Sequence, residues 1–348
     1  MFLHALTTAN PSRSFTQPEC LLLAKSSSAL HNQLDRRSRL LLSAILRGDS
    51  GINCRQFAVR DIGRLFDMDA DELNEEFRQT APALGAQALS AALEQAGVRP
   101  DALDALVVCT CTGYLCPGIS SYVSEITGLR SDAWLQDLVG LGCGAAIPAL
   151  RAVDGILAAH PAATVACVAV EVCSAAFYLD NDPGVIISAC LFGDGAAATI
   201  WKSQPGPSGL RCHSFDTHHD PQERDRIRFE QRQGKLRNLL HPSVPVLAAG
   251  AVKSLYARAE AGNRRPVGRI LSHTGGRDVL DELEKEFPQH DFGTSRTILR
   301  RHGNMSSPSV LFALAEALRE GLPDGSADWW LTSFGAGFSA HACRVGVS

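Results

Sequence analysis

The sequence lacks any apolar run approaching the roughly 20 residues that a membrane-spanning helix needs. It also lacks a basic excess: 33 Lys and Arg stand against 37 Asp and Glu, and the formal net charge is −4. This balance argues against nucleic acid as the main partner. The first residues, MFLHALTTANPSRSF, have a short apolar stretch with no basic lead, so they predict a strand ending at Asn10-Pro11 rather than a signal peptide. We expect a cytoplasmic protein with no integral membrane segment.

The cysteines lack the arrangements typical of disulfide frameworks and metal sites. There are eleven, an odd number, and many lie in apolar, strand-like runs such as VVCTCTG and VACVAVEVC. Without a secretory signal, these are expected to be reduced, buried thiols. Cys109, Cys111 and Cys116 have neither the two-residue spacing of a zinc knuckle nor a nearby histidine pair, so no metal site is expected.

No low-complexity linker divides the chain, although its 348 residues exceed the usual size of one domain. A helix, a Gly/Pro stop and an apolar strand follow one another in 81–113, and the same order returns in 244–276. A second helix and strand follow in each half. We therefore expect an α/β fold with a duplicated αβαβα core, mostly parallel sheets, and halves at 1–210 and 211–348. The polar stretches 203–209 and 216–234 are expected to be surface loops.

Cys143 lies between Gly142 and Gly144, directly before a stretch whose apolar residues recur at helical spacing. Unpaired N–H groups and the helix dipole stabilise a thiolate at such a position, which predicts a nucleophile with a lowered pKa. The flanking glycines would let another backbone or a substrate approach closely. The alternative interpretation is a small core residue at a tight turn.

Two further polar residues occupy matching places in the repeat. His273 ends the strand GRILSHT before a glycine turn, and Asn304, in HGNMSS, stands at a helix start as Cys143 does. A satisfied core histidine and a helix-capping asparagine are the alternatives. Because strand ends and helix starts converge between the halves, we expect the three residues to share a site. Cys, His and Asn together can perform acyl transfer, with His and Asn stabilising an oxyanion or enolate.

The motifs VGLGCGAAIPAL, SACLFGDGAAA, LSHTGGRDVLD, RRHGNMSSPSVLFAL and SFGAGFSAH resemble those of type III polyketide synthases, the chalcone synthase-like branch of the thiolase superfamily. The resemblance runs nearly end to end. It implies a homodimer with a duplicated αβαβα thiolase-like core of layered mixed sheets, in which Cys143 carries the acyl group and His273 and Asn304 are catalytic. It also implies coenzyme A thioesters as substrates, without a metal or redox cofactor: malonyl-CoA, and an acyl-CoA or acyl-ACP starter.

The resemblance further implies a set of substrate-contacting residues. These are Phe192, Thr112, Cys173, Ala176, Asn238, Gly275, Gly276, Gly335 and Ala336. Phe192 matches a gatekeeper phenylalanine between the coenzyme A tunnel and the reaction cavity; the alternative is strand-end packing. Thr112 matches a cavity serine, and the backbone near Gly335 is expected to bind the acyl oxygen. Cys116 matches a residue that reaches toward the partner's cavity.

Several positions depart from the plant pattern. Cys173 and Ala176 stand where the chalcone-forming cavity has threonines, and Asn238 stands where a second gatekeeper phenylalanine falls. The motifs EVCSAAF and FGAGFSAH resemble bacterial synthases that extend long fatty acyl starters, so we expect an alkylresorcinol or alkylpyrone product.

The basic coenzyme A contacts of the family have no clear counterpart. The nearby candidates, which equally fit a solvated helix face, are Arg36, Arg37, Arg39 and Arg47. Three other functions stay open: a single-condensation ketoacyl-ACP synthase III-like enzyme, a papain-like cysteine hydrolase and a non-enzymatic binding module.

Overall fold

The computed structural model describes residues 1–261, 265–323 and 325–347. Nine strands form one sheet, in the order β11 (Val267–Ser272), β12 (Asp328–Gly335), β13 (Ser339–Val347), β8 (Leu210–His219), β1 (Phe2–Ala9), β7 (Gly195–Lys202), β6 (Val165–Glu171), β4 (Ala105–Cys109) and β5 (Trp134–Leu138). Two small pairs are added by β2 (Ser14–Thr16) with β3 (Cys54–Gln56), and by β9 (Ile227–Arg232) with β10 (Lys235–Leu240).

The helices connect and cover these strands. They are α1 (Gln17–Ser26), α2 (Ser28–Gln33), α3 (Arg36–Arg47), α4 (Ala70–Ala96), α5 (Ile119–Thr127), α6 (Ala146–Ala159), α7 (Pro183–Leu191), α8 (Val244–Glu260), α9 (Arg277–Glu286), α10 (Gly293–His302) and α11 (Ser309–Glu320). Within the described residues, no helix has both the length and the apolar character needed to cross a membrane.

The sheet contains the same strand order twice. In one part β1, β7, β6 and β4 lie side by side, with two antiparallel pairs and then a parallel pair. In the other part β8, β13, β12 and β11 repeat that pattern. The two parts meet where Phe2 on β1 pairs with Arg211 on β8. This order is the duplicated core that the sequence predicts; the boundary at residue 210 stays a prediction.

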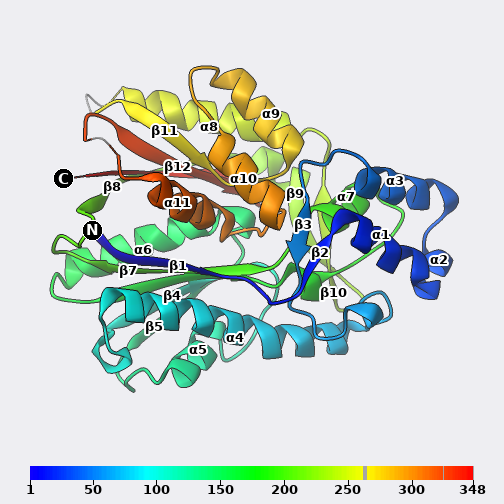
Figure 1. The fold of residues 1–348 in the computed structure, drawn as a ribbon, viewed down its shortest axis with the longest axis horizontal. Helices are drawn as coiled ribbons and strands as arrows, with labels where there is room; N and C mark the ends of the chain where they lie inside the picture. The colour runs from blue at the N-terminus through cyan, green and yellow to red at the C-terminus, as the bar shows by residue number, and fades with distance from the viewer. Residues whose placement is uncertain (262–264, 324, 348) are drawn as a thin grey trace.

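The expectation of mostly parallel strands is wrong, since antiparallel pairs outnumber parallel ones. Continuous apolar runs indicate strands that are buried on both faces, and they do not set strand direction. Here antiparallel strands are buried in the same way because helices cover both faces. Figure 1 shows α6 and α11 between the two parts of the sheet, with α4 and α5 outside one part and α8 and α9 outside the other.

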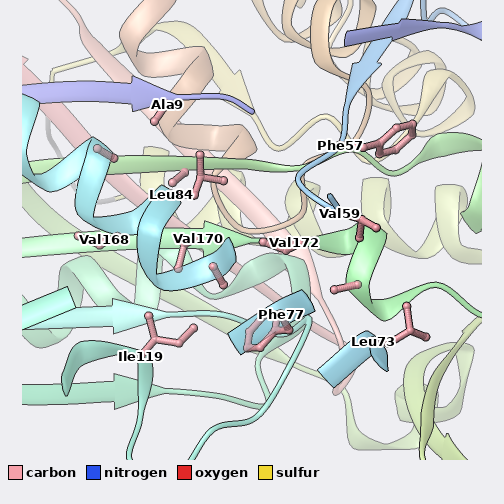
Figure 2. Close-up of a cluster of buried hydrophobic side chains, with 14 of the residues drawn as sticks. Ala9, Phe57, Val59, Leu73, Phe77, Leu84, Ile119, Val168, Val170 and Val172 are labelled. Atoms are coloured by element: carbon pink, nitrogen blue, oxygen red, sulfur yellow. The ribbon is translucent and has the colours of Figure 1, made fainter. Parts of the chain in front are cut away.

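The long helix α4 covers β1, β6 and β7 and buries one of the three apolar clusters of the core. Its N-cap, Asp69, accepts a hydrogen bond from Glu72 N, and the Glu72 side chain bonds back in a capping box. Gly97 ends the helix in the left-handed conformation (φ +62°), which glycine adopts without strain. Figure 2 shows Phe77 and Leu84 of this helix facing Val168 and Val170 of β6.

Two segments differ from the sequence expectation. The stretch 216–234 is not a loop: it continues β8 and then forms the β9–β10 hairpin, whose turn at Gln233 and Gly234 has positive φ at both residues. The C-terminal stretch that predicts one strand forms two, β12 and β13, which are antiparallel neighbours. Gly337, with φ +122°, lies in the turn between them.

Candidate active site

A cavity of about 910 Å³ contains Cys143, His273 and Asn304 in its lining. Cys143 lies in a short 3-10 turn directly before α6, and His273 is the first residue after β11. Asn304 lies between α10 and α11 rather than at a helix start, and its backbone forms an isolated parallel bridge with Phe192 at the end of α7. The structure thus brings together, at one cavity, three residues that lie far apart in the sequence.

The turn that carries Cys143 is packed backbone to backbone against the end of β12 and the first residue after it. A Cβ atom on Gly335 would lie 2.9 Å from Cys143 N and 2.6 Å from Gly144 N. Gly142 has φ +57°, and a Cβ there would lie 2.8 Å from Ala336 N. The glycines on either side of the cysteine are therefore needed for close approach, as the sequence predicts. Gly335 and Ala336 lie behind Cys143, against its backbone, and do not line the cavity.

The Cys143 thiol is only 6% exposed, and its sulfur accepts a hydrogen bond of 3.2 Å from the Ser306 hydroxyl. Burial raises the pKa of this thiol to about 12, and the hydrogen bond from Ser306 opposes that rise. The lowered pKa expected from the helix start is therefore wrong for the resting site. The physical reason is that desolvation of the thiolate outweighs the stabilisation that a helix N-terminus provides.

His273 is buried and packs edge-on against the Phe334 ring, with 5.0 Å between ring centroids. Its backbone N–H donates to Thr332 O at 2.8 Å, which continues the pairing of β11 with β12. Burial lowers the pKa of the imidazole to about 3, so the resting ring is neutral. Its Nδ1 atom has no hydrogen-bond partner among the described residues.

The side-chain amide of Asn304 is held from both ends. Its Nδ2 donates to Gly275 O at 2.7 Å, and its Oδ1 accepts from Ser306 N at 2.8 Å. These two contacts fix which end of the amide carries the hydrogens, so the second Nδ2 hydrogen is available to an oxygen in the cavity. Gly275 has φ +57° and, together with Gly276, lines the same cavity.

Two residues of this site have no place in the sequence prediction. Ser306 has φ +59°, an uncommon conformation for a residue other than glycine, and its hydroxyl lies 3.1 Å from the Cys111 sulfur as well as close to Cys143. Glu171, fully buried at the end of β6, accepts hydrogen bonds from Thr112 N (3.1 Å) and Thr112 Oγ1 (2.8 Å) and from Ser307 Oγ (2.6 Å). Glu171 thus ties the 110–112 loop to the segment that carries Ser306. The sequence signal for Glu171 was a charged residue within an otherwise apolar strand.

A second, small cavity of about 40 Å³ contains most of the other predicted substrate contacts. Phe192 lines this cavity as well as the large one, which is the position expected of a residue between a tunnel and a reaction cavity. The predicted residues that line the small cavity are Thr112, Cys173, Ala176, Asn238 and Phe192.

The remaining candidates lie elsewhere. Cys116 is exposed in the loop between β4 and α5. The arginines of α3, namely Arg36, Arg37, Arg39 and Arg47, do not line the large cavity, although Leu41, Ala44 and Ile45 of the same helix do. Within the described ranges, no group of three or more His, Cys, Asp or Glu is placed to hold a metal ion.

Comparison with known proteins agrees with this geometry. A family model described as FAE1/Type III polyketide synthase-like protein matches residues 15–208, and one for the C-terminal part of 3-oxoacyl-[acyl-carrier-protein] synthase III matches 264–347. The chain is 31% identical over 287 residues to a 3,5-dihydroxyphenylacetyl-CoA synthase of Streptomyces toyocaensis, covering 79% of this chain and 74% of the relative. It is 28% identical over 338 residues to a 1,3,6,8-tetrahydroxynaphthalene synthase of Streptomyces coelicolor, covering 95% and 88%.

Solved structures show the same fold. The tetrahydroxynaphthalene synthase of S. coelicolor superimposes with a TM-score of 0.86 at 24% identity, covering 100% of this chain and 99% of that one. A polyketide synthase from the brown alga Ectocarpus siliculosus gives 0.87 at 22% identity, covering 100% and 98%. This chain belongs to the type III polyketide synthase family, whose members are condensing enzymes of the acyltransferase class. The papain-like alternative and the non-enzymatic alternative are therefore wrong.

Proposed function

We propose that the protein condenses malonyl-CoA with a short acyl starter, repeatedly and with loss of carbon dioxide, and cyclises the chain to a small aromatic polyketide. The observation that carries this proposal is the meeting of Cys143, His273 and Asn304 at one cavity. The reaction needs a nucleophile that holds the acyl group and donors that stabilise the enolate formed on decarboxylation, and these residues supply both.

In the proposed mechanism, the Cys143 sulfur attacks the starter thioester, and coenzyme A leaves as its thiol, protonated from His273. Malonyl-CoA then loses carbon dioxide, and the enolate oxygen is stabilised by hydrogen bonds from His273 and the Asn304 amide. The enolate carbon attacks the acyl group on Cys143, which releases the sulfur and gives a β-ketoacyl-CoA that is two carbons longer. No metal or redox cofactor enters these steps.

The neutral resting forms of Cys143 and His273 are compatible with this mechanism. With the pKa of Cys143 raised to about 12 and that of His273 lowered to about 3, neither group is charged alone at neutral pH. In the proposed mechanism a thiolate in this cavity is therefore formed together with a protonated His273, since each charge offsets the desolvation of the other. Proton transfer from Cys143 to His273 places the proton where the leaving coenzyme A thiolate needs it.

The space beyond Phe192 leaves little room for the long-chain starter predicted from the sequence. The cavity that Cys173, Ala176 and Asn238 line beyond Phe192 has a volume of about 40 Å³, room for only a few water molecules. The names of the relatives above describe small aromatic products. We therefore propose a short starter in place of a fatty acyl chain, with malonyl-CoA as the extender.

Starter length is tested with acyl-CoA thioesters of increasing chain length. We expect kcat/KM to fall as the starter lengthens, because added methylenes have no room beyond Phe192. Ala176→Trp, which fills the same space, is expected to shift products toward fewer extensions. Cys173→Ser, which alters the volume little, serves as the control. Mass analysis of the products reads out both; efficient turnover of long starters would restore the alkylresorcinol interpretation.

Product analysis also separates iteration from the single-condensation alternative. A ketoacyl-ACP synthase III-like enzyme would stop after one condensation and release a linear β-keto thioester. We expect cyclised products that contain several malonyl-derived units, which isotope-labelled malonyl-CoA would reveal. We propose acyl-CoA or acyl-ACP as the starter carrier and a cytoplasmic location for the protein.

We also propose a homodimer formed through the β5 side of the sheet. β5 is an edge strand, and Trp134 on it is 52% exposed; Val139, Tyr114 and Ile126, nearby in sequence or on adjacent elements, are also exposed. An unpaired edge strand beside exposed apolar side chains is typical of an interface. The loop containing Cys116 precedes α5 on this side, so it would lie at the proposed interface.

Sedimentation at micromolar concentration tests the dimer. The wild-type protein is expected to sediment as a dimer, and Trp134→Glu is expected to shift it toward monomer, because a charge would then be buried in the interface. Leu22→Glu, at another exposed apolar position, on α1, is the matched control. A wild-type monomer would contradict the proposal.

A further inference from the structure

The wall of the large cavity is mainly apolar, and its charged side chains are unusual for a site that admits a phosphorylated substrate. Among the described residues that line it, four are aspartates, namely Asp49, Asp182, Asp225 and Asp278, and one is a guanidinium, Arg277. Coenzyme A carries several phosphate charges, which carboxylates repel and guanidinium groups bind. The balance of charge at this cavity therefore depends on how each aspartate is paired.

Two of the aspartates are paired with arginines that do not line the cavity. Asp182 lies 3.5 Å from Arg237, and Asp225 lies 3.3 Å from Arg228. Arg237 is 12% exposed and is also bound to Asp180 at 2.7 Å, so it is not free to turn toward a ligand. These pairs reduce the repulsion that the two aspartates exert, but they supply no cation to the cavity.

Arg277 is held differently. It is the first residue of α9, four residues after His273, and its side chain is partly exposed. Its Nη1 donates to the backbone oxygen of Asp49, in the loop after α3, so the side chain spans from one half of the chain to the other. Its Nε and Nη2 lie 3.3 Å from Asp278 Oδ1, a long and solvent-accessible contact that is easily exchanged.

The backbone at the start of α9 adds to the positive electrostatic potential around Arg277. Gly276, the N-cap of α9, supplies no side-chain cap, so the N–H groups of the first turn and the positive end of the helix dipole remain available beside Arg277. We propose that Arg277 is the residue that binds the phosphates of the incoming coenzyme A thioester, exchanging Asp278 and the Asp49 carbonyl for phosphate oxygens. This inference rests on the proposed function, and it places carrier recognition in α9 instead of the α3 arginines.

The test compares two thioesters that differ in their phosphates. Malonyl-CoA carries them, and malonyl-N-acetylcysteamine has the same reacting end without them. For Arg277→Ala, we expect the ratio of kcat/KM for malonyl-CoA to that for malonyl-N-acetylcysteamine to fall about ten-fold or more, as for the loss of one charge-assisted contact. Arg277→Lys should retain part of the ratio, since it keeps the charge but loses the bidentate geometry.

Two further variants sharpen the result. Asp278→Asn removes the competing carboxylate and is expected to raise the ratio. Arg36→Ala, on α3, is the matched control and is expected to leave it unchanged. Arg277→Ala also removes the hydrogen bond to the Asp49 backbone oxygen, so thermal melting is measured to check that the fold is retained.

Two results would overturn the inference: an unchanged ratio in Arg277→Ala, whether or not turnover of both thioesters falls equally, or a loss of the ratio in Arg36→Ala in its place. Calorimetric titration with free coenzyme A gives a readout that needs no turnover, and we expect weaker binding to Arg277→Ala. If the wild-type protein binds coenzyme A through Arg277 yet makes no polyketide from either thioester, the proposed function fails while this inference stands. If coenzyme A does not bind to the wild-type protein, the inference fails.

Discussion

Cys143→Ala is expected to abolish polyketide formation, by more than about a thousand-fold, while a slow decarboxylation of malonyl-CoA survives. The substitution removes the sulfur, which is the only atom that holds the growing chain in the proposed mechanism. It leaves in place His273 and the Asn304 amide, the proposed donors to the enolate, and neither has a hydrogen bond to the Cys143 sulfur within the described residues. Product and released carbon dioxide are measured separately on the same samples.

The matched control is Cys167→Ala, a buried cysteine on β6 that lines neither cavity. It loses a similar side-chain volume and is expected to keep product turnover, apart from a small loss of stability. Intact-protein mass should show the acyl group on wild type and on Cys167→Ala, and none on Cys143→Ala. Full product turnover by Cys143→Ala would end the assignment of Cys143 as the nucleophile.

The sequence predicts the parts of the fold and site that local patterns encode. The helix after Cys143, the strand before His273 and the glycine turn after it all follow from apolar periodicity and from glycine placement. The close packing at Gly142 also follows, because glycines on both sides of a cysteine leave room for another backbone. What these signals share is that each spans only a few residues.

Features that depend on contacts across the chain were not predictable in this way. The left-handed backbone of Ser306 carries no sequence signal, yet it lets one hydroxyl bridge toward both Cys143 and Cys111. The raised pKa of Cys143 is likewise a property of burial by both halves together. The prediction of mostly parallel strands was wrong for a similar reason, since buried antiparallel strands have the same apolar runs as parallel ones.

The charged residues show the same limit. The arginines of α3 were candidates because they lie near the segment where the family has its basic coenzyme A contacts, but the helix presents Leu41, Ala44 and Ile45 to the cavity instead. Arg277 gave no such signal because it is isolated among acidic and apolar neighbours in SHTGGRDVLD. Only the folded chain places it beside the Asp49 loop.

Asn304→Ala is expected to reduce malonyl decarboxylation by about 10²–10³-fold, the usual effect of removing one donor from an oxyanion site, while acyl loading of Cys143 changes much less. The reason lies in how the amide is held. Ser306 N and Gly275 O fix its orientation at 2.8 Å and 2.7 Å, so one N–H hydrogen is preorganised for the enolate oxygen. Loading needs the sulfur and His273, neither of which bonds to this amide in the described structure.

The substitution also leaves Ser306 N and Gly275 O without partners, which is expected to cost about 1–3 kcal/mol of folding stability, and thermal melting must be measured beside activity.

Asn304→Asp separates the two effects. It keeps an oxygen that accepts from Ser306 N, but it removes the donor and places a negative charge beside the developing enolate, so decarboxylation should fall at least as far as in the alanine variant. Asn74→Ala, exposed on α4, is the control for a surface asparagine. Stopped-flow release of carbon dioxide and mass analysis of acylated Cys143 measure the two steps independently. If both variants lose loading and decarboxylation to the same extent, Asn304 supports the cavity as a whole, and its assignment to the enolate oxygen is wrong.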